Sequence, residues 1–141
     1  MSAKGHIEPT PENAKAVFAR GLKGPIVMLN LLRFRDVADY SGSPELAPAK
    51  PMSGAEAYKV YMAHATPFVA KIGGELVWAG EGGAALIGPT DEHWDMIILV
   101  RYPGLEQFMK FASDPEYQKG VGHRTAALAD SRLVPMTARN G

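Results

Sequence analysis

The chain has 141 residues, which suits one domain with its own buried core. Hydrophobic residues make up 46% and charged residues 21%, values typical of a globular protein. The 15 basic residues balance 15 acidic ones, so no net charge attracts nucleic acid or a membrane surface. The absence of cysteine excludes disulfides, thiolate nucleophiles and cysteine-based metal sites.

The N-terminal part, residues 1–23, reads as a loose arm followed by a helix. It has no apolar segment typical of a signal peptide, and no run in the chain approaches the ~20 apolar residues that span a bilayer. We therefore expect a cytoplasmic protein without membrane contact. Thr10 and Pro11 predict the helix start, as the N-cap and the first helical position, and Gly21 predicts its end.

The next segments are a strand, a long loop and a helix. Ile26 to Phe34 is nearly all apolar and predicts a buried strand. Residues 35–52 are rich in proline and either are disordered or passively packed, or form a lid or a partner-wrapping arm. Ser53 and Glu56 form a capping box before a helix to about residue 72, in which Pro67 predicts a kink. Its apolar face comprises Tyr58, Tyr61, Met62, Ala65, Phe68, Val69 and Ile72.

The second half alternates strands and helices. The expected segments are short strands at 75–79 and 84–87, a strand at 94–102, a helix from Pro103, a helix from Asp114 to about Asp130, and a strand at 132–137. This order contains β-α-β-β-α-β, the split βαβ pattern of an α+β ferredoxin-like domain over residues 24–141. Such a domain has an antiparallel sheet with helices on one face.

The two long strands are apolar on both faces, although the helices of this fold cover only one. A second copy of the same sheet is the economical cover for the other face, which predicts a homodimer.

The sequence resembles the domain-of-unknown-function 1330 family in three stretches. These are "GPIVMLNLLRF", "AYKVYMAHATPFVAKIGGELVWAGEG" and "WDMIILVRYPGLEQFMKFASDPEYQ". The resemblance implies a dimeric α/β-barrel, in which two ferredoxin-like sheets pair. Its superfamily includes cofactor-independent monooxygenases, isomerases and haem-dependent enzymes, typically with a pocket between sheet and helices. No catalytic residue follows from this family, and fold does not imply function.

Asn30 and His64 are the candidate catalytic residues. Asn30 lies within an apolar strand, where an amide either anchors a neighbouring backbone or donates to a substrate carbonyl or oxyanion. His64 lies on the flank of the 53–72 helix and is either a structural side chain or a general base.

Four further residues are candidate ligand contacts. Tyr61, Trp78 and Tyr102 are either core residues or walls of a pocket for an apolar or aromatic ligand. Arg33 either pairs with an acidic residue or, with His123-Arg124 and Arg101, binds an anion. No histidine spacing predicts a metal site, and no glycine motif predicts a nucleotide or other cofactor.

Three functions remain open at this point. The first is a small-molecule enzyme of the cofactor-independent oxygenase or isomerase type, with His64 as base and Asn30 as oxyanion donor. The second is a non-catalytic dimer that binds a small apolar ligand. The third is a structural homodimer without a pocket.

Overall fold

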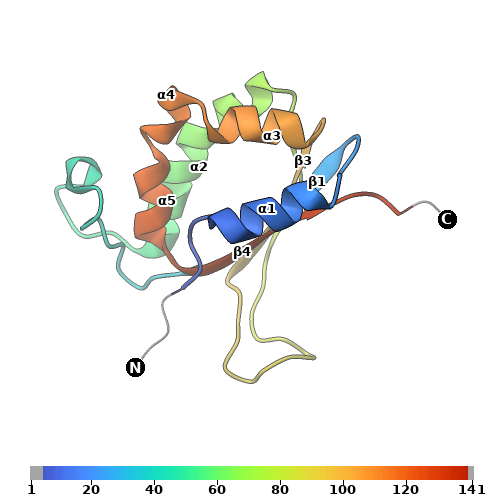
Figure 1. The fold of residues 1–141 in the computed structure, drawn as a ribbon. Helices are drawn as coiled ribbons and strands as arrows, with labels where there is room; N and C mark the ends of the chain where they lie inside the picture. Colours follow the sequence, from blue (N-terminus) through green and yellow to red (C-terminus); the bar gives the residue numbers. More distant parts are fainter. Residues whose placement is uncertain (1–4, 140–141) are drawn as a thin grey trace.

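The computed structural model describes residues 5–139 and has a four-stranded antiparallel sheet, in the order β2-β3-β1-β4, with helices on one face (Figure 1). The elements are α1 (Pro11–Ala19), β1 (Ile26–Phe34), the 3-10 turn η1 (Pro44–Leu46), α2 (Gly54–Lys71), β2 (Glu75–Glu81), β3 (Met96–Tyr102), α3 (Leu105–Ala112), α4 (Pro115–Gln118), α5 (Val121–Ala127) and β4 (Leu128–Met136). This is the α+β ferredoxin-like fold that the sequence predicts, with the additional N-terminal helix.

The helix starts follow the predicted capping chemistry. The Thr10 hydroxyl accepts the N–H of Asn13 at 3.1 Å, with Pro11 in the first turn of α1. At α2, Ser53 accepts the N–H of Glu56, whose carboxylate accepts the N–H of Ser53 in return. Capping side chains that accept backbone N–H groups three residues later therefore set where these helices begin.

The predicted strand at 84–87 is wrong. Residues 82–95 instead form a long loop with one isolated bridge, between Ala84 and His93. Leu86 and Ile87 are 100% and 94% exposed in it. The ladder between β2 and β3 ends at the pair Glu81 and Met96, so this short apolar run has no strand beside it. The adjoining strand accordingly begins at Met96 rather than Trp94.

The single long helix predicted from Asp114 to about Asp130 is also wrong. The chain forms α4 and α5 with a break at Gly120, and β4 begins at Leu128, four residues before the predicted Arg132. Gly120 lies against the His64 ring, where a β-carbon would come within 2.3 Å of Cδ2. The segment after Ala127 pairs with β1, and this ladder outweighs the helix propensity.

The core lies between the sheet and the helix layer. The buried side chains of this helix-covered face are Ile26, Met28 and Leu32 of β1 and Ile98 and Tyr102 of β3. They meet the predicted apolar face of α2, where Tyr58, Tyr61 and Ala65 are buried. Alternation along the strands therefore selects which residues enter the core.

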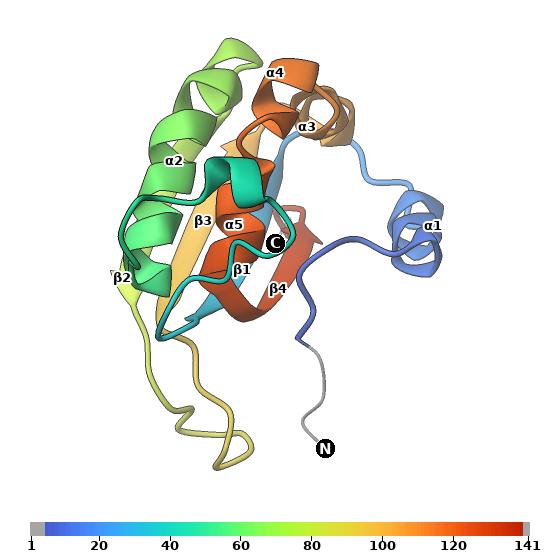
Figure 2. The ribbon, with the colours of Figure 1, turned by 90° about the vertical axis from the view of Figure 1, so that its left-hand side faces the viewer.

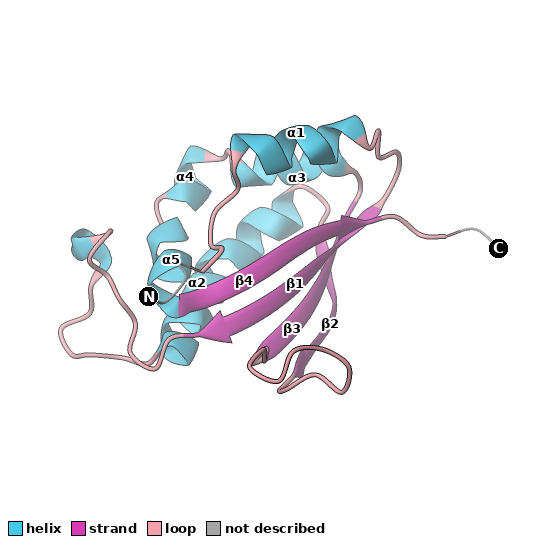
Figure 3. Ribbon diagram, turned by 60° about the horizontal axis from the view of Figure 1, so that its bottom comes forward, coloured by secondary structure: helices cyan, strands magenta, loops and turns pink. Residues whose placement is uncertain are grey.

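The opposite face of the sheet, called here the bare face, has no helix over it (Figure 3). One row of apolar side chains crosses all four strands through the cross-strand pairs Trp78–Leu99, Leu99–Leu29 and Leu29–Val134. Trp78 is 53% exposed and Val134 42%. The prediction that the central strands are apolar on both faces is confirmed, and within residues 5–139 this row remains uncovered.

The N-terminal helix α1 and the 35–52 loop contact different parts of the domain: α1 lies on the side of β4, and the loop lies against α5 (Figure 2). Next to α1, the Arg20 guanidinium donates to the carbonyl of Pro135 at the edge strand, while the helix itself has no buried residue. The 35–52 loop packs along α5, because Asp39 donates its N–H to Ala126 and the Tyr40 hydroxyl lies 2.8 Å from His123 Nδ1. The loop therefore belongs to the folded unit.

Candidate functional site

Asn30 faces the helix layer from β1, but its amide is fully engaged by the sheet. Nδ2 donates to the carbonyl oxygens of Met28 and Ile98, each at 3.3 Å. An amide nitrogen carries two N–H groups, so both are committed to backbone acceptors. In this arrangement Asn30 stabilises the pairing of the two central strands and has no free donor.

His64 projects from α2 toward α4. Its Nε2 lies 2.9 Å from the carbonyl oxygen of Tyr117, and its ring stacks on the Tyr117 ring at a centroid distance of 6.3 Å. A carbonyl only accepts, so Nε2 carries the proton, and in the neutral ring Nδ1 carries the lone pair. The contact holds the ring in one tautomer and one orientation.

A cluster of tyrosines fills the space between the helix-covered face and α2, α3 and α4. Its members are Tyr58, Tyr61, Tyr102 and Tyr117. The hydroxyls of Tyr61 and Tyr117 are 2.7 Å apart and hydrogen-bonded to each other. Three of the predicted site residues, Tyr61, Tyr102 and His64, lie together here around a tyrosine that sequence reasoning missed.

That missed residue is Tyr117, the centre of the cluster. Its ring contacts those of Tyr61, Phe68 and Phe111, and it is 6% exposed. It lies in a helix of only four residues, where no periodic pattern marks a buried face. The cap at Asp114 followed by Pro115 fixes that short helix and hence the inward direction of Tyr117.

Burial dominates the electrostatics of the tyrosine cluster. It raises the pKa of each of the four phenols above the ordinary value of 10.0. Neighbouring hydroxyls raise the pKa of Tyr102 and Tyr117 further, because a second phenolate nearby is unfavourable. The hydroxyls therefore stay protonated at neutral pH, and each retains an O–H group capable of donating a hydrogen bond.

Arg124 of α5 lies beside the same hydroxyls. Its positive charge acts against burial and lowers the pKa of Tyr58, Tyr61 and Tyr117. The guanidinium donates to the carbonyl of Ile7 at 2.5 Å and to Ser131 Oγ at 3.4 Å. Arg124 was one of several candidate anion ligands in the sequence, and the fold distinguishes it by placing it, half-buried, beside the tyrosine cluster.

Arg33, Arg101 and Trp78 lie on the bare face, away from the tyrosine cluster. Arg33 Nη2 is 4.0 Å from Asp130, and Arg101 Nη1 is 3.2 Å from Glu75. For Arg33 this is the acidic partner that one of its two alternatives predicted, and Arg101 has such a partner as well. Strand alternation explains the separation of Arg33 and Arg101, because neighbouring residues of a strand point to opposite faces. At Trp78 the register shift between Leu76 and Trp78 decides the face.

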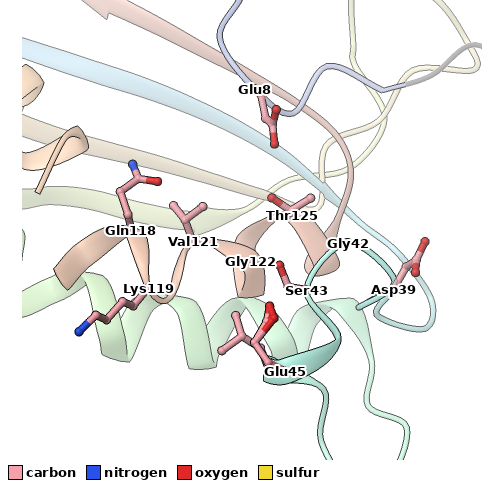
Figure 4. Close-up of a pocket in the computed structure, with 11 residues that line it drawn as sticks. Glu8, Asp39, Gly42, Ser43, Glu45, Gln118, Lys119, Val121, Gly122 and Thr125 are labelled. Carbon is pink, nitrogen blue, oxygen red and sulfur yellow. The ribbon is translucent and has the colours of Figure 1, made fainter. Parts of the chain in front are cut away.

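A separate hollow of about 590 Å³ opens beside α5 (Figure 4). The 35–52 loop supplies Ser43 and Glu45, the arm supplies Glu8, and α5 supplies Thr125. Its lining also includes Asp39, Gly42, Leu46, Gln118, Lys119, Val121 and Gly122. This hollow lies on the outer side of α5 and contains none of the predicted site residues.

The described part of the chain has neither a cluster of metal ligands nor a helix suited to cross a membrane. Within residues 5–139 no three histidine, aspartate or glutamate side chains gather as metal ligands would. Over the same range, none of the helices has the length and apolar character needed to cross a membrane.

Comparison with known proteins places the chain in a family. The crystal structure of methylated RPA0582 protein is 40% identical, covers 98% of each chain and superposes with a TM-score of 0.84. A second RPA0582 structure, a protein of unknown function from Rhodopseudomonas palustris, is 40% identical with a TM-score of 0.81, covering 97% of this chain and 99% of that chain.

A more distant likeness concerns the fold alone. SnoaB, a cofactor-independent oxygenase from Streptomyces nogalater, is 13% identical over 84% of this chain and 97% of its own, with a TM-score of 0.52. No curated protein matches this sequence significantly. The model of the Domain of unknown function (DUF1330) matches residues 51–137, and the chain belongs to that family.

Proposed function

We propose that the protein is a homodimer that binds a small, largely apolar molecule between its sheet and helix layer. The observation that carries this proposal is the tyrosine cluster, four phenol hydroxyls converging in an otherwise apolar interior. Apolar and aromatic walls with a few convergent polar groups are the usual composition of a small-molecule site. A core without a ligand role would be better stabilised by phenylalanine, since each buried hydroxyl requires a partner.

The homodimer part of the proposal rests on the bare face. Its row from Trp78 to Val134 presents apolar side chains to solvent across the full width of the sheet. Large exposed apolar patches mark interaction sites, and a two-fold pair of identical faces is self-complementary. The ion pairs Arg101–Glu75 and Arg33–Asp130 would lie toward the rim, where polar groups remain hydrated.

Sedimentation velocity tests the dimer with Val134→Glu and a matched control, Val60→Glu. Val134 is 42% exposed on the bare face and Val60 is 39% exposed on α2. Because the two-fold axis would place two new carboxylates in the apolar interface, Val134→Glu should weaken the dimer at least tenfold, about 1.4 kcal/mol. A wild-type protein that sediments as a monomer, or equal behaviour of the two variants, would contradict the proposal.

Ligand-observed NMR tests the binding site, using a panel of small aromatic acids, ketones and phenols. At least one compound should bind saturably to the wild type and be lost in the double variant Tyr61→Phe/Tyr117→Phe. That variant removes both bonded hydroxyls together and leaves no unpaired partner. If the whole panel fails to bind, the chain is better described as a structural homodimer.

A second candidate function is a cofactor-independent oxygenase or isomerase at the same site. The fixed tautomer of His64 favours it, because Nε2 is held at the Tyr117 carbonyl and Nδ1 remains as the base. The committed amide of Asn30 speaks against the companion role of oxyanion donor. The phenols and Arg124 are better donors to a developing oxyanion.

Turnover measurements separate the enzyme from the binder. Each compound that binds would be incubated with the protein while oxygen uptake and product mass are followed. His64→Gln should lower any turnover about a hundredfold or more while leaving binding in place. Saturable binding without turnover would assign the non-catalytic role.

A further inference from the structure

The N-terminal arm, residues 5–9, contacts Arg124 through Ile7, as a bound ligand would. The carbonyl oxygen of Ile7 accepts from the guanidinium at 2.5 Å. The side chain of the same residue is partly buried and packs against the core. One residue thus places an oxygen acceptor on the cation and an apolar side chain against the core.

Within the described residues, Arg124 has no carboxylate as a counter-ion, although a half-buried cation ordinarily has one. None of the ion pairs among residues 5–139 includes it, whereas Arg33, Arg101 and Arg132 each have a carboxylate. Its observed partners, the Ile7 carbonyl and the Ser131 hydroxyl, are neutral. A guanidinium binds a carboxylate more strongly than it binds neutral oxygens, because two parallel charge-assisted hydrogen bonds form.

Besides the packing of Ile7, a few polar contacts attach the arm to the domain. The His6 N–H donates to the Asp130 carboxylate at 2.8 Å, and the Ser131 hydroxyl donates to the His6 carbonyl. Gly5 makes the closest approach, because a β-carbon there would lie 1.8 Å from the carbonyl oxygen of Ala129. Such contacts are individually weak, so a competing ligand can replace the arm.

We propose that Arg124 is the anchor for a small apolar carboxylic acid, which enters by displacing the arm at Ile7. The carboxylate takes the place of the Ile7 carbonyl, and its apolar body takes the place of the isoleucine side chain. This inference rests on the proposed binding function and adds the class of ligand. It also makes the arm an internal competitor that keeps the site closed until the acid is present.

Isothermal titration with phenylacetate and its neutral isostere phenylacetamide tests the ligand class on the wild-type protein. Phenylacetate should bind at least tenfold more tightly, because only the acid forms the two charge-assisted bonds. Arg124→Gln should remove this preference. The control Arg101→Gln, whose arginine pairs with Glu75 on the bare face, should retain it.

Gly5→Ala tests the competition by the arm. The added methyl group clashes with the Ala129 carbonyl and expels the arm, so phenylacetate should bind at least fivefold more tightly than to the wild type. Circular dichroism and sedimentation would verify that each variant keeps its fold and oligomeric state.

The outcomes separate this inference from the proposed function. Equal affinity for acid and amide, or an undiminished acid preference in Arg124→Gln, overturns the carboxylate anchor and leaves small-molecule binding intact. Unchanged affinity in Gly5→Ala overturns the role of the arm. If neither compound binds the wild type or Gly5→Ala, the carboxylate inference fails, and the wider NMR panel decides whether the binding function fails with it.

Discussion

The two faces of the sheet are built from the same strands but have different chemistry. The helix-covered face combines fully buried aliphatic residues with the tyrosine cluster and its paired hydroxyls. The bare face carries an apolar row without a hydroxyl, with ion pairs beside it. An apolar interior with a few convergent hydroxyls suits a ligand site, whereas a plain apolar surface suits another copy of itself.

The largest loss of stability is expected at Ile98 of β3. Its neighbour Ile97 serves as the comparison, because adjacent residues of a strand point to opposite faces. Ile98 is 1% exposed on the helix-covered face, so Ile98→Ala should lower the free energy of unfolding by about 4 kcal/mol through lost burial and a cavity. Ile97→Ala, on the bare face, should cost about 1 kcal/mol or less in dilute protein.

Urea titrations at two protein concentrations check this pair of variants. The loss for Ile97→Ala should grow with concentration, since the dimer stabilises the folded chain by mass action. Equal losses at all concentrations would remove the distinction between the faces.

The next largest loss of stability is expected at Gly54, where the start of α2 lies close to the backbone of two other segments. A β-carbon at Gly54 would lie 2.3 Å from the Arg35 carbonyl oxygen and 2.5 Å from that of Ala127. Gly54→Ala should therefore destabilise the protein by about 3 kcal/mol, because backbone must move. Gly42→Ala is the control in thermal unfolding, since nothing lies within 4 Å there. A melting temperature for Gly54→Ala like that of Gly42→Ala would contradict the close packing.

Removing one of the paired hydroxyls of Tyr61 and Tyr117 should cause a smaller loss of stability. Tyr61→Phe should lower stability by about 2 kcal/mol, because it leaves the Tyr117 hydroxyl buried without a partner. The double variant Tyr61→Phe/Tyr117→Phe should lose less than the sum of the single variants. Strict additivity in a double-mutant cycle would show that the two hydroxyls do not interact.

The smallest effect is a pH dependence at the edge of the sheet. Burial raises the pKa of Asp130, but the N–H groups of His6 and Ser131 and the Arg132 guanidinium outweigh it and hold the pKa below 3.8. A depressed carboxyl stabilises the fold above the unfolded-state pKa, and this contribution disappears as pH falls through the folded-state value. The stability difference between wild type and Asp130→Asn should therefore be constant well above pH 3.8 and shrink as the pH falls through that value and below it. A stability difference that persists in acid would show that Asp130 stabilises the fold through hydrogen bonds alone and not through its charge.

Local sequence signals predicted much of the fold and part of the candidate site. The strand from Ile26 to Phe34 and the caps at Thr10 and Ser53 lie where their residue patterns place them. Tyr61 and Tyr102 lie in the interior cluster, because helical spacing and strand alternation direct them there. Trp78 lies on the opposite face, because the register of β2 shifts between Leu76 and Trp78. The residue pattern of the strand did not predict this shift.

The sequence by itself determined the order of elements, the helix starts and the two apolar faces of the central strands, because these depend on neighbours a few residues apart. Tertiary structure decided that residues 84–87 form no strand, that Gly120 breaks the last helix, and that Tyr117, Arg124 and Ile7 meet. Each of these depends on contacts with residues far along the chain: the edge of a strand, the His64 ring or the arm. Local propensity carries no information about such contacts.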